Sequence, residues 1–196
     1  MCPIYPLFPN LKIIEVGCGL GGGVEWIKRA HSECQNVIGI DKVIDPTDDG
    51  TFIEGNAEAI PLPSSSVDLL INVESSHLYD NPQKFFDEVY RVLKPNGYFC
   101  WADLRYKDMM AKTLEEISQA KLHLTSYENI TAEILNGIEF TSRRYDKILD
   151  KAPWLLKIFR NSIRATYCAP GTHTYNRFAS REKIYAAACW CKKELS

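Results

Sequence analysis

The sequence predicts an α/β fold with a mostly parallel sheet, helices on both faces and an antiparallel C-terminal strand. Short apolar runs alternate along the chain with amphipathic helical segments, which is the pattern of repeated strand–helix–strand units. The first apolar run leads into a glycine-rich turn, and a helical pattern begins directly after it. The 196 residues are enough for a core of ordinary size, so we expect a single domain over residues 1–196.

The predicted elements follow one another in a regular order. Strands are predicted from short apolar runs at residues 11–18, 36–41, 51–56, 67–75, 98–105, 121–130 and 182–193. Helices are predicted from apolar residues at helical spacing over residues 23–31, 81–94, 109–120, 130–152 and 153–167. Residues 95–97, Pro-Asn-Gly, are a stop signal for the helix before them, and Pro153 ends the long helix. The link from Asp41 to residue 51 is too short for a crossover helix of normal length.

The charge and hydropathy of the chain exclude several function classes. A formal net charge of -2 gives no indication of a nucleic-acid or anionic-membrane partner, and we expect no nucleic acid. The short basic pair Arg143–Arg144 is expected to lie on a solvated face. Because no apolar run reaches about eighteen residues, we expect no membrane span. Residues 1–10 lack the basic and apolar regions of a signal peptide.

The cysteines indicate a reduced protein. The chain has seven of them, an odd number, and they are dispersed. Cys189 and Cys191 form the tightest pair, and on a strand their thiols would point the same way. This spacing is too short for a zinc knuckle, so we interpret the cysteines as core thiols of a cytoplasmic protein and expect no metal site.

The glycine-rich turn suggests a ligand, and Glu15 helps to identify it. Gly17, Gly19 and Gly22 have the G-x-G-x-x-G spacing, which lets backbone approach a ligand at the start of a helix. Asp41 ends the second predicted strand and can accept both hydroxyls of an adenosine ribose, so these features fit any adenosine-containing ligand. The Glu15 carboxylate would repel a pyrophosphate but attract a ligand with ammonium and sulfonium groups, such as S-adenosylmethionine. A helix cap or an ion-paired strand residue is the structural alternative for Glu15.

Several longer motifs resemble those of class I S-adenosylmethionine-dependent methyltransferases. EVGCGLGGG is similar to the first motif of that family and VIGID to the acidic second motif. EGNAEAIPLPSSSVDLLINVESSHLY and FFDEVYRVLKPNGYF extend the resemblance over residues 11–104. NVESSHLY, ADLR and ENITAEIL most resemble the phthiotriolone and phenolphthiotriolone dimycocerosate O-methyltransferase group. The resemblance implies a Rossmann-like methyltransferase sheet, S-adenosylmethionine as cofactor and a hydrophobic small-molecule or lipid-like acceptor.

The resemblance also implies a set of site residues. Glu15, Gly17 and Gly19 would form the loop on the methionine side, and Asn72 would offer backbone to the methionine ammonium. The contacts implied for the adenosine half are Asp41 for the ribose, Lys42 beside the adenine, and Asn56 and Ala57 at the adenine edge. Asn56 stands where the family usually has aspartate, but its amide oxygen can still accept from the adenine amino group.

His77 is the predicted catalytic residue. Histidine changes protonation near neutral pH, and His77 follows the fourth predicted strand, at the sheet edge where ligands of open α/β folds bind. We therefore expect His77 to remove the proton of an acceptor hydroxyl, with packing in the pocket wall as the alternative. Glu74 is a candidate to orient His77, and Tyr79 to line the pocket. His173 is expected in a surface loop.

The rest of the chain leaves the acceptor open. Residues 106–180 are expected to contribute a substrate cap. Its apolar residues Trp154, Leu155, Leu156, Ile158 and Phe159 are of a kind ordinarily found in a core or against a lipophilic acceptor. A carbon or nitrogen methyltransferase remains an alternative. So does a protein of this fold that has lost catalysis and serves as a scaffold, because the cover usually N-terminal to the first strand and the second crossover helix are missing. A dehydrogenase that binds a nicotinamide cofactor is the remaining alternative.

Overall fold

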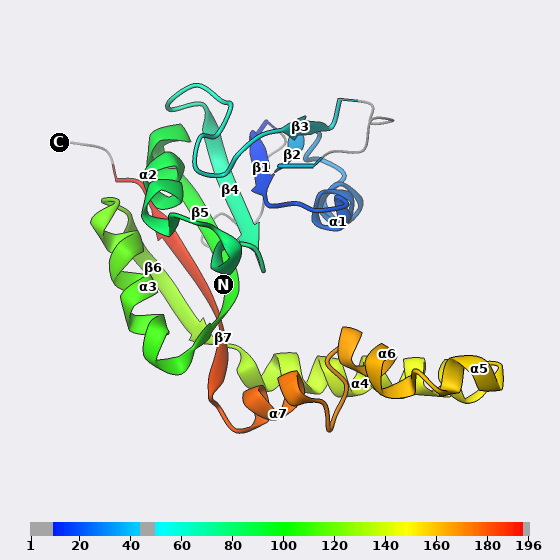
Figure 1. Cartoon of the computed structure of the whole chain (residues 1–196). Helices are drawn as coiled ribbons and strands as arrows, with labels where there is room; N and C mark the ends of the chain where they lie inside the picture. Colours follow the sequence, from blue (N-terminus) through cyan, green and yellow to red (C-terminus); the bar gives the residue numbers. More distant parts are fainter. Residues whose placement is uncertain (1–9, 44–49, 194–196) are drawn as a thin grey trace. The chain divides into compact units, whose positions relative to one another are not determined.

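The computed structural model describes residues 10–43 and 50–193, and it confirms the predicted α/β fold (Figure 1). Its seven-stranded sheet has the order β3-β2-β1-β4-β5-β7-β6. The strands are β1 (Ile13–Val16), β2 (Val37–Asp41), β3 (Phe52–Glu54), β4 (Val67–Val73), β5 (Leu93–Tyr106), β6 (His123–Asn129) and β7 (Lys183–Cys191). The expectation that residues 1–10 are not a signal peptide, and the expected short link from Asp41 to residue 51, fall largely on residues 1–9 and 44–49, which lie outside the described residues.

Helices separate most of the strands. They are α1 (Gly22–Ala30), α2 (Pro82–Val92), α3 (Lys107–Gln119), α4 (Thr131–Asp150), α5 (Trp154–Lys157), α6 (Arg160–Thr166) and α7 (His173–Ala179), with a 3-10 helix, η1 (Ser76–Leu78). Helix α2 shows which interactions start a helix and hold it in the core. The Asn81 side chain accepts a hydrogen bond from the Lys84 amide at its start, with Pro82 in the first turn. Phe85 and Phe86 are fully buried, and the Phe85 ring lies 6.0 Å from the ring of Phe99 in β5.

The central strands are parallel and bring their carboxyl ends to one edge. Ile13 of β1 pairs with Val37 of β2 on one side and with Leu69 of β4 on the other. The C-terminal strand is antiparallel to β5, because the Lys192 amide donates to the Gly97 carbonyl while the Lys107 amide donates to the Glu182 carbonyl. The residues that follow β1, β2 and β4 therefore meet at the edge where ligands of such sheets bind.

Three local predictions were wrong. The helix over 81–94 ends at Val92, and the Pro-Asn-Gly stop signal lies inside β5. There the strand bulges: Val67 pairs with Leu93, but Leu69 pairs with Tyr98. The helix predicted over 153–167 is divided into α5 and α6. The loop expected around His173 is the first turn of α7, where the Thr172 hydroxyl accepts from the Tyr175 amide.

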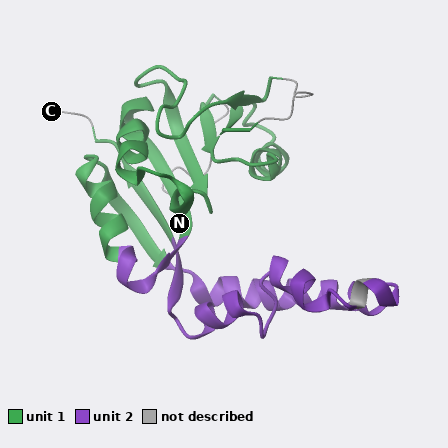
Figure 2. Cartoon of the chain, viewed as in Figure 1, with its two compact units in different colours: residues 1–103, 111–128, 187–196 green, residues 104–110, 129–186 purple. Residues whose placement is uncertain are grey.

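The chain forms two compact units (Figure 2). The sheet unit contains the described residues up to 103, residues 111–128 and those from 187 onward, and the helical unit contains residues 104–110 and 129–186. Buried aromatic rings form part of the core of the sheet unit; Trp190 stacks on Phe99 at 5.5 Å and meets Trp101 edge-on at 6.1 Å. In the described part of the chain, no helix is long and apolar enough to cross a bilayer.

Candidate functional site

The turn between β1 and α1 depends on glycine. Gly17, Gly19 and Gly21 have φ values of 74°, 54° and 80°, a left-handed region that side chains disfavour. The third left-handed residue is thus Gly21, whereas Gly22 of the predicted spacing is the first residue of α1. A Cβ on Gly17 would lie 2.3 Å from the Ser75 hydroxyl oxygen. The turn therefore passes closer to the segment after β4 than any residue with a side chain would allow.

Glu15 lies behind this turn. Its side chain is buried under the first turn of α1, where a Cβ on Gly23 would lie 2.2 Å from its Oε1 atom. Burial raises the pKa of the Glu15 carboxyl, and a hydrogen bond from the Val24 amide partly offsets that rise. Among the described residues its Oε2 atom has no hydrogen-bond partner. Glu15 thus braces the amino end of α1 and does not line the pocket described next.

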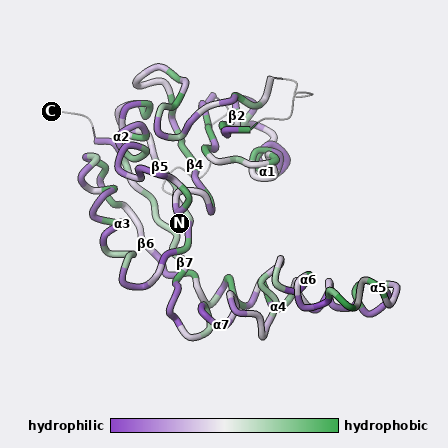
Figure 3. The backbone as a smooth tube through the Cα atoms, in the orientation of Figure 1, coloured by the Kyte–Doolittle hydropathy of each residue, from purple (hydrophilic) through white to green (hydrophobic). Residues whose placement is uncertain are grey.

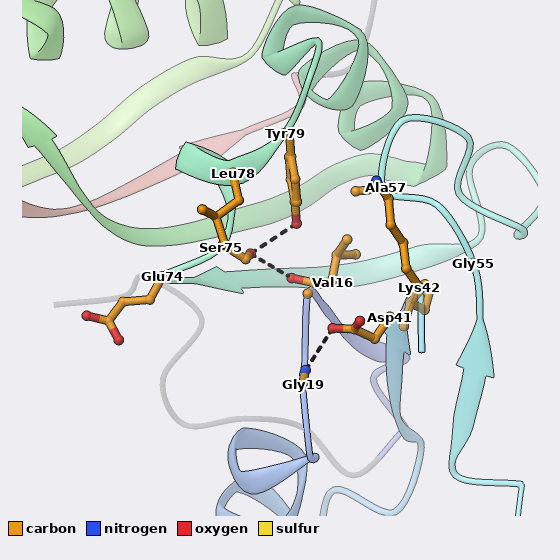
Figure 4. A pocket seen from close by; sticks show the side chains of 12 residues that line it. Val16, Gly19, Asp41, Lys42, Gly55, Ala57, Glu74, Ser75, Leu78 and Tyr79 are labelled. Atoms are coloured by element: carbon orange, nitrogen blue, oxygen red, sulfur yellow. Dashed lines mark hydrogen bonds between the residues drawn. The ribbon is translucent and has the colours of Figure 1, made fainter. Parts of the chain in front are cut away.

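A pocket of about 420 Å³ opens at this edge of the sheet (Figure 4). Five of the predicted cofactor contacts line it: Gly17, Gly19, Asp41, Lys42 and Ala57. Residues from the segment after β4 complete the wall, namely Glu74, Ser75, Leu78 and Tyr79. The pocket therefore joins the ends of β1, β2 and β4, as the parallel topology predicts.

The Asp41 carboxylate accepts hydrogen bonds from two backbone amides, one of which, that of Gly19, lies in the pocket wall. Its Oδ2 atom accepts from the Gly19 amide at 2.8 Å, and its Oδ1 atom accepts from the Val43 amide at 3.3 Å. Asn56 lies farther along the rim, in a neighbouring hollow that it shares with Lys42. The Asn56 Oδ1 atom accepts from the Glu58 amide at 3.0 Å, so its side chain shapes the turn after β3.

The buried side chain of Asn72 holds part of the pocket wall in place. Asn72 is completely buried, and its Nδ2 atom lies 2.8 Å from the Val16 carbonyl, 2.6 Å from the Ser75 hydroxyl and 3.0 Å from the Tyr79 hydroxyl. Burial raises the pKa of Tyr79, although its hydrogen bonds with Ser75 and Asn72 partly offset that rise. The Asn72 side chain thus fixes Ser75 and Tyr79, which line the pocket, without lining it itself.

His77 contacts a residue that the sequence had not singled out. Its Nδ1 atom lies 2.7 Å from Oδ1 of Asp103, a carboxylate on β5 that is fully buried. The other oxygen, Oδ2, accepts from the Ser76 hydroxyl at 2.7 Å and from the His77 amide at 3.1 Å. The Trp101 indole donates to the Ser76 hydroxyl at 2.9 Å. The carboxylate therefore holds both the backbone and the ring of His77.

Glu74, the candidate orienter of His77, points elsewhere. In Figure 4 its carboxylate is directed away from the other lining side chains, and its backbone has a φ of 49°. The signal that could have found Asp103 is its position in β5. The apolar residues Phe99 and Trp101 are buried on one face of the strand, and Asp103 is the next residue of that alternation. A carboxylate at a buried strand position requires partners.

The sequence of this chain is similar to those of known methyltransferases. A family model described as a methyltransferase domain matches residues 14–101. The chain is 29% identical over 195 residues to a fatty-acid O-methyltransferase of Mycolicibacterium smegmatis, covering 92% of this chain and 68% of that protein. It is 31% identical over 189 residues to a phthiotriol/phenolphthiotriol dimycocerosates methyltransferase of Mycobacterium tuberculosis, covering 92% of this chain and 69% of that protein.

A solved structure has a similar fold. It is the phosphoethanolamine N-methyltransferase 2 of Haemonchus contortus in complex with S-adenosyl-L-methionine, with a TM-score of 0.75 and 15% identity. The match covers 97% of this chain and 50% of that one.

Proposed function

The chain belongs to the S-adenosylmethionine-dependent methyltransferase family, and on that premise we propose that it methylates an oxygen atom of a lipid-like, hydroxylated acceptor. The acceptor class is supported by the two relatives, which are named for fatty-acid and for phthiotriol methylation. The observation that carries the proposal is the contact between His77 and the buried Asp103, because it leaves the second ring nitrogen of His77 able to take a proton.

The pocket fits S-adenosylmethionine in size and in the chemistry of its lining. Its volume of about 420 Å³ lies within the range of roughly 300–1,000 Å³ usual for such ligands. Gly17 and Gly19 expose backbone, and Asp41 brings a carboxylate to the end of β2. The residues proposed to contact the cofactor are Gly17, Gly19, Asp41, Lys42, Asn56 and Ala57. Glu15 and Asn72 are proposed to support the site without contacting the cofactor: Glu15 braces α1, and Asn72 holds Ser75 and Tyr79. When bound, S-adenosylmethionine supplies a methyl group that is already activated on a sulfonium.

His77 and Asp103 are proposed to position the acceptor and remove its proton. The Asp103 carboxylate accepts a hydrogen bond from Nδ1–H of His77, which keeps the proton on Nδ1 and the Nε2 lone pair available. The acceptor oxygen would bond to the methyl carbon as the carbon–sulfur bond breaks and its electron pair goes to sulfur, and the hydroxyl proton would pass to Nε2 of His77. A carboxylate acceptor is already ionised at neutral pH, so it needs no such base. The role of His77 is therefore proposed for hydroxyl acceptors.

Two acceptors of equal chain length test the proposal: a long-chain alcohol and the corresponding fatty acid. Titration calorimetry with S-adenosylmethionine and S-adenosylhomocysteine first establishes cofactor binding, and methyl transfer is then measured with each acceptor. We expect His77→Ala to lower kcat with the alcohol by about 100-fold or more, as is usual for loss of a general base. Cofactor affinity should not change.

The matched control is His123→Ala, a histidine exposed on β6. Alcohol methylation at the normal rate by His77→Ala would remove the base role. Methylation of a carbon or nitrogen acceptor alone would overturn the choice of accepting atom.

A further inference from the structure

The helical unit exposes large apolar side chains between α4 and α6. Trp154, Leu155, Ile158 and Phe159 are 71%, 57%, 66% and 60% exposed, so of the two interpretations left open by the sequence, a place in the core does not hold for these four. Trp154 and Leu155 lie on α5, and Ile158 and Phe159 lie in the turn that joins α5 to α6. The backbone around α5 is coloured hydrophobic in Figure 3. Because soluble proteins rarely expose contiguous apolar patches, this group indicates a contact surface.

One face of helix α4 carries both apolar and basic side chains; we call it the mixed face. At 100° per residue, Phe140, Arg144, Lys147 and Ile148 lie on one side of the helix. Phe140 and Ile148 are 77% and 57% exposed, and both cations are exposed between them. Lys151 follows at the carboxyl end of the helix. Apolar and basic side chains thus alternate over one surface.

Two acidic residues of α4, Asp146 and Asp150, bind side chains of the following helical segment. Asp150 Oδ1 accepts from Arg160 at 2.6 Å, and Asp146 binds Arg164 and the Tyr167 hydroxyl. These bonds join α6 to α4 and neutralise both carboxylates inside the helical unit.

The cations of the mixed face have no such partners. Within the described residues, Arg144, Lys147 and Lys151 form no ion pair. Residues 140–160 contain six Lys or Arg and two Asp, a net charge of +4 in a chain whose formal net charge is -2. This segment is therefore basic within a chain of net negative charge, and Arg143 and Arg144 are exposed, in agreement with the predicted solvated face.

We propose that this surface docks on an anionic lipid bilayer. The α4–α5 surface consists of Phe140, Arg144, Lys147, Ile148, Lys151, Trp154, Leu155, Ile158 and Phe159. Its aromatic and aliphatic side chains enter the headgroup region, and its cations contact lipid phosphates, as in proteins that lie at a membrane interface without spanning it. A second copy of the chain on this surface would bring two segments of net charge +4 together, which disfavours a symmetric dimer.

Trp154 provides the reporter for the first test. The chain has four tryptophans, of which Trp101 and Trp190 are 2% and 0% exposed. In Trp26→Phe protein, quenching by acrylamide therefore reports mainly on Trp154. Vesicles of phosphatidylcholine with phosphatidylglycerol should protect Trp154 from quenching and shift its emission to the blue. Vesicles of phosphatidylcholine alone should do neither.

Vesicle co-sedimentation of variants separates the two contributions. Each basic residue near an anionic surface contributes about fivefold in affinity, so losing three of them costs roughly 100-fold, and the charge reversals in R144E/K147E/K151E should weaken binding by at least that much. W154S/F159S should remove it. Trp26→Ser is the matched control, because Trp26 is 60% exposed but lies on α1. Cofactor titration of every variant should be unchanged, which distinguishes this proposal from the proposed methyl transfer.

Three results would overturn the proposal: equal binding to neutral and anionic vesicles, unchanged binding by W154S/F159S, and no vesicle binding at all. Analytical ultracentrifugation belongs in the same series. Self-association that W154S/F159S abolishes, with no vesicle binding, would make this surface an interface between copies of the chain.

Discussion

Replacing Asp103 by asparagine changes one buried atom and should move a proton on His77. In the native residue Oδ2 accepts two hydrogen bonds, from the Ser76 hydroxyl and the His77 amide, at 2.7 and 3.1 Å. The asparagine oxygen is therefore expected to stay on that side, and its NH₂ group then faces the His77 ring. That group can only donate, so Nδ1 must become an acceptor and the ring proton moves to Nε2. His77 then has no lone pair for the acceptor hydroxyl.

The size of the loss follows from what a general base contributes. We expect kcat with the alcohol acceptor to fall by about 100- to 10,000-fold. The weakened hydrogen bonds should cost on the order of 1–3 kcal/mol of unfolding free energy. For a chain of this length that cost lowers the melting temperature by roughly 2–4 °C per kcal/mol, so the protein remains folded at assay temperature.

The assay compares initial rates with the alcohol and the fatty acid, together with calorimetric cofactor affinity and thermal melting. Asp68→Asn is the control, because that carboxylate pairs with Lys94 at 2.8 Å away from the pocket. The D103N/H77A double variant should be no slower than the slower single variant, since both changes remove one function. Alcohol turnover by Asp103→Asn within about twofold of the native rate would refute the tautomer argument. An equal loss with both acceptors would show a merely structural role.

Three further predictions concern the sheet unit. Gly17→Ala should weaken S-adenosylmethionine binding about tenfold or more by calorimetry, because its φ is 74° and its Cβ would meet a buried hydroxyl at 2.3 Å. Gly22→Ala, which meets nothing within 4 Å, should bind normally; equal affinities would contradict the close approach. The pKa of Glu15 in the folded protein is raised above its usual 4.5. Ionising the buried carboxyl therefore lowers the free energy of unfolding; this loss is absent below pH 4.5 and develops as the pH rises through the folded pKa. The melting temperature of native protein should therefore fall relative to Glu15→Gln over that rise, and parallel pH profiles would contradict it. Cys100 and Cys189 have sulfur atoms 3.6 Å apart, so hydrogen peroxide should oxidise the two thiols to a disulfide, with two water molecules as the other product. Mass spectrometry of peptides would detect the link, and its absence after oxidation of both thiols would contradict the pairing.

Local sequence patterns were sufficient for most of the fold. Every predicted strand is present, and the buried ones, such as β1 and β4, are short runs of apolar side chains; β6 is mostly polar and exposed. The pocket residues that came from motif spacing, such as Gly17 and Asp41, are close together because β1 and β2 are adjacent parallel strands. Turn signals were less reliable. Asn96 adopts a left-handed φ of 63° inside a bulge of β5, where the same residue type would also suit a helix end.

Long-range contacts could not be predicted in this way. Asp103 meets His77 across 26 positions of sequence, and only the register of β4 with β5 brings them together. The exposure of Trp154 also depends on tertiary structure. Helix α6 folds back through the bonds of Asp146 and Asp150, which directs the apolar turn outward. From composition alone, such a turn is expected either in a core or against a lipophilic acceptor.

The two backbone bonds of Asp41 have a consequence for the energetics of recognition. A flexible glycine segment normally loses conformational entropy when a ligand orders it, and that loss is subtracted from the affinity. Here the Asp41 carboxylate, which we propose meets the ligand, already restrains the Gly19 and Val43 amides. The ordering therefore occurs when the protein folds, and the ligand meets a pre-organised surface. Losing the Asp41 carboxylate would have two separable effects, a missing acceptor and a looser loop. Titrations of Asp41→Asn at several temperatures would show the looser loop as a more unfavourable binding entropy.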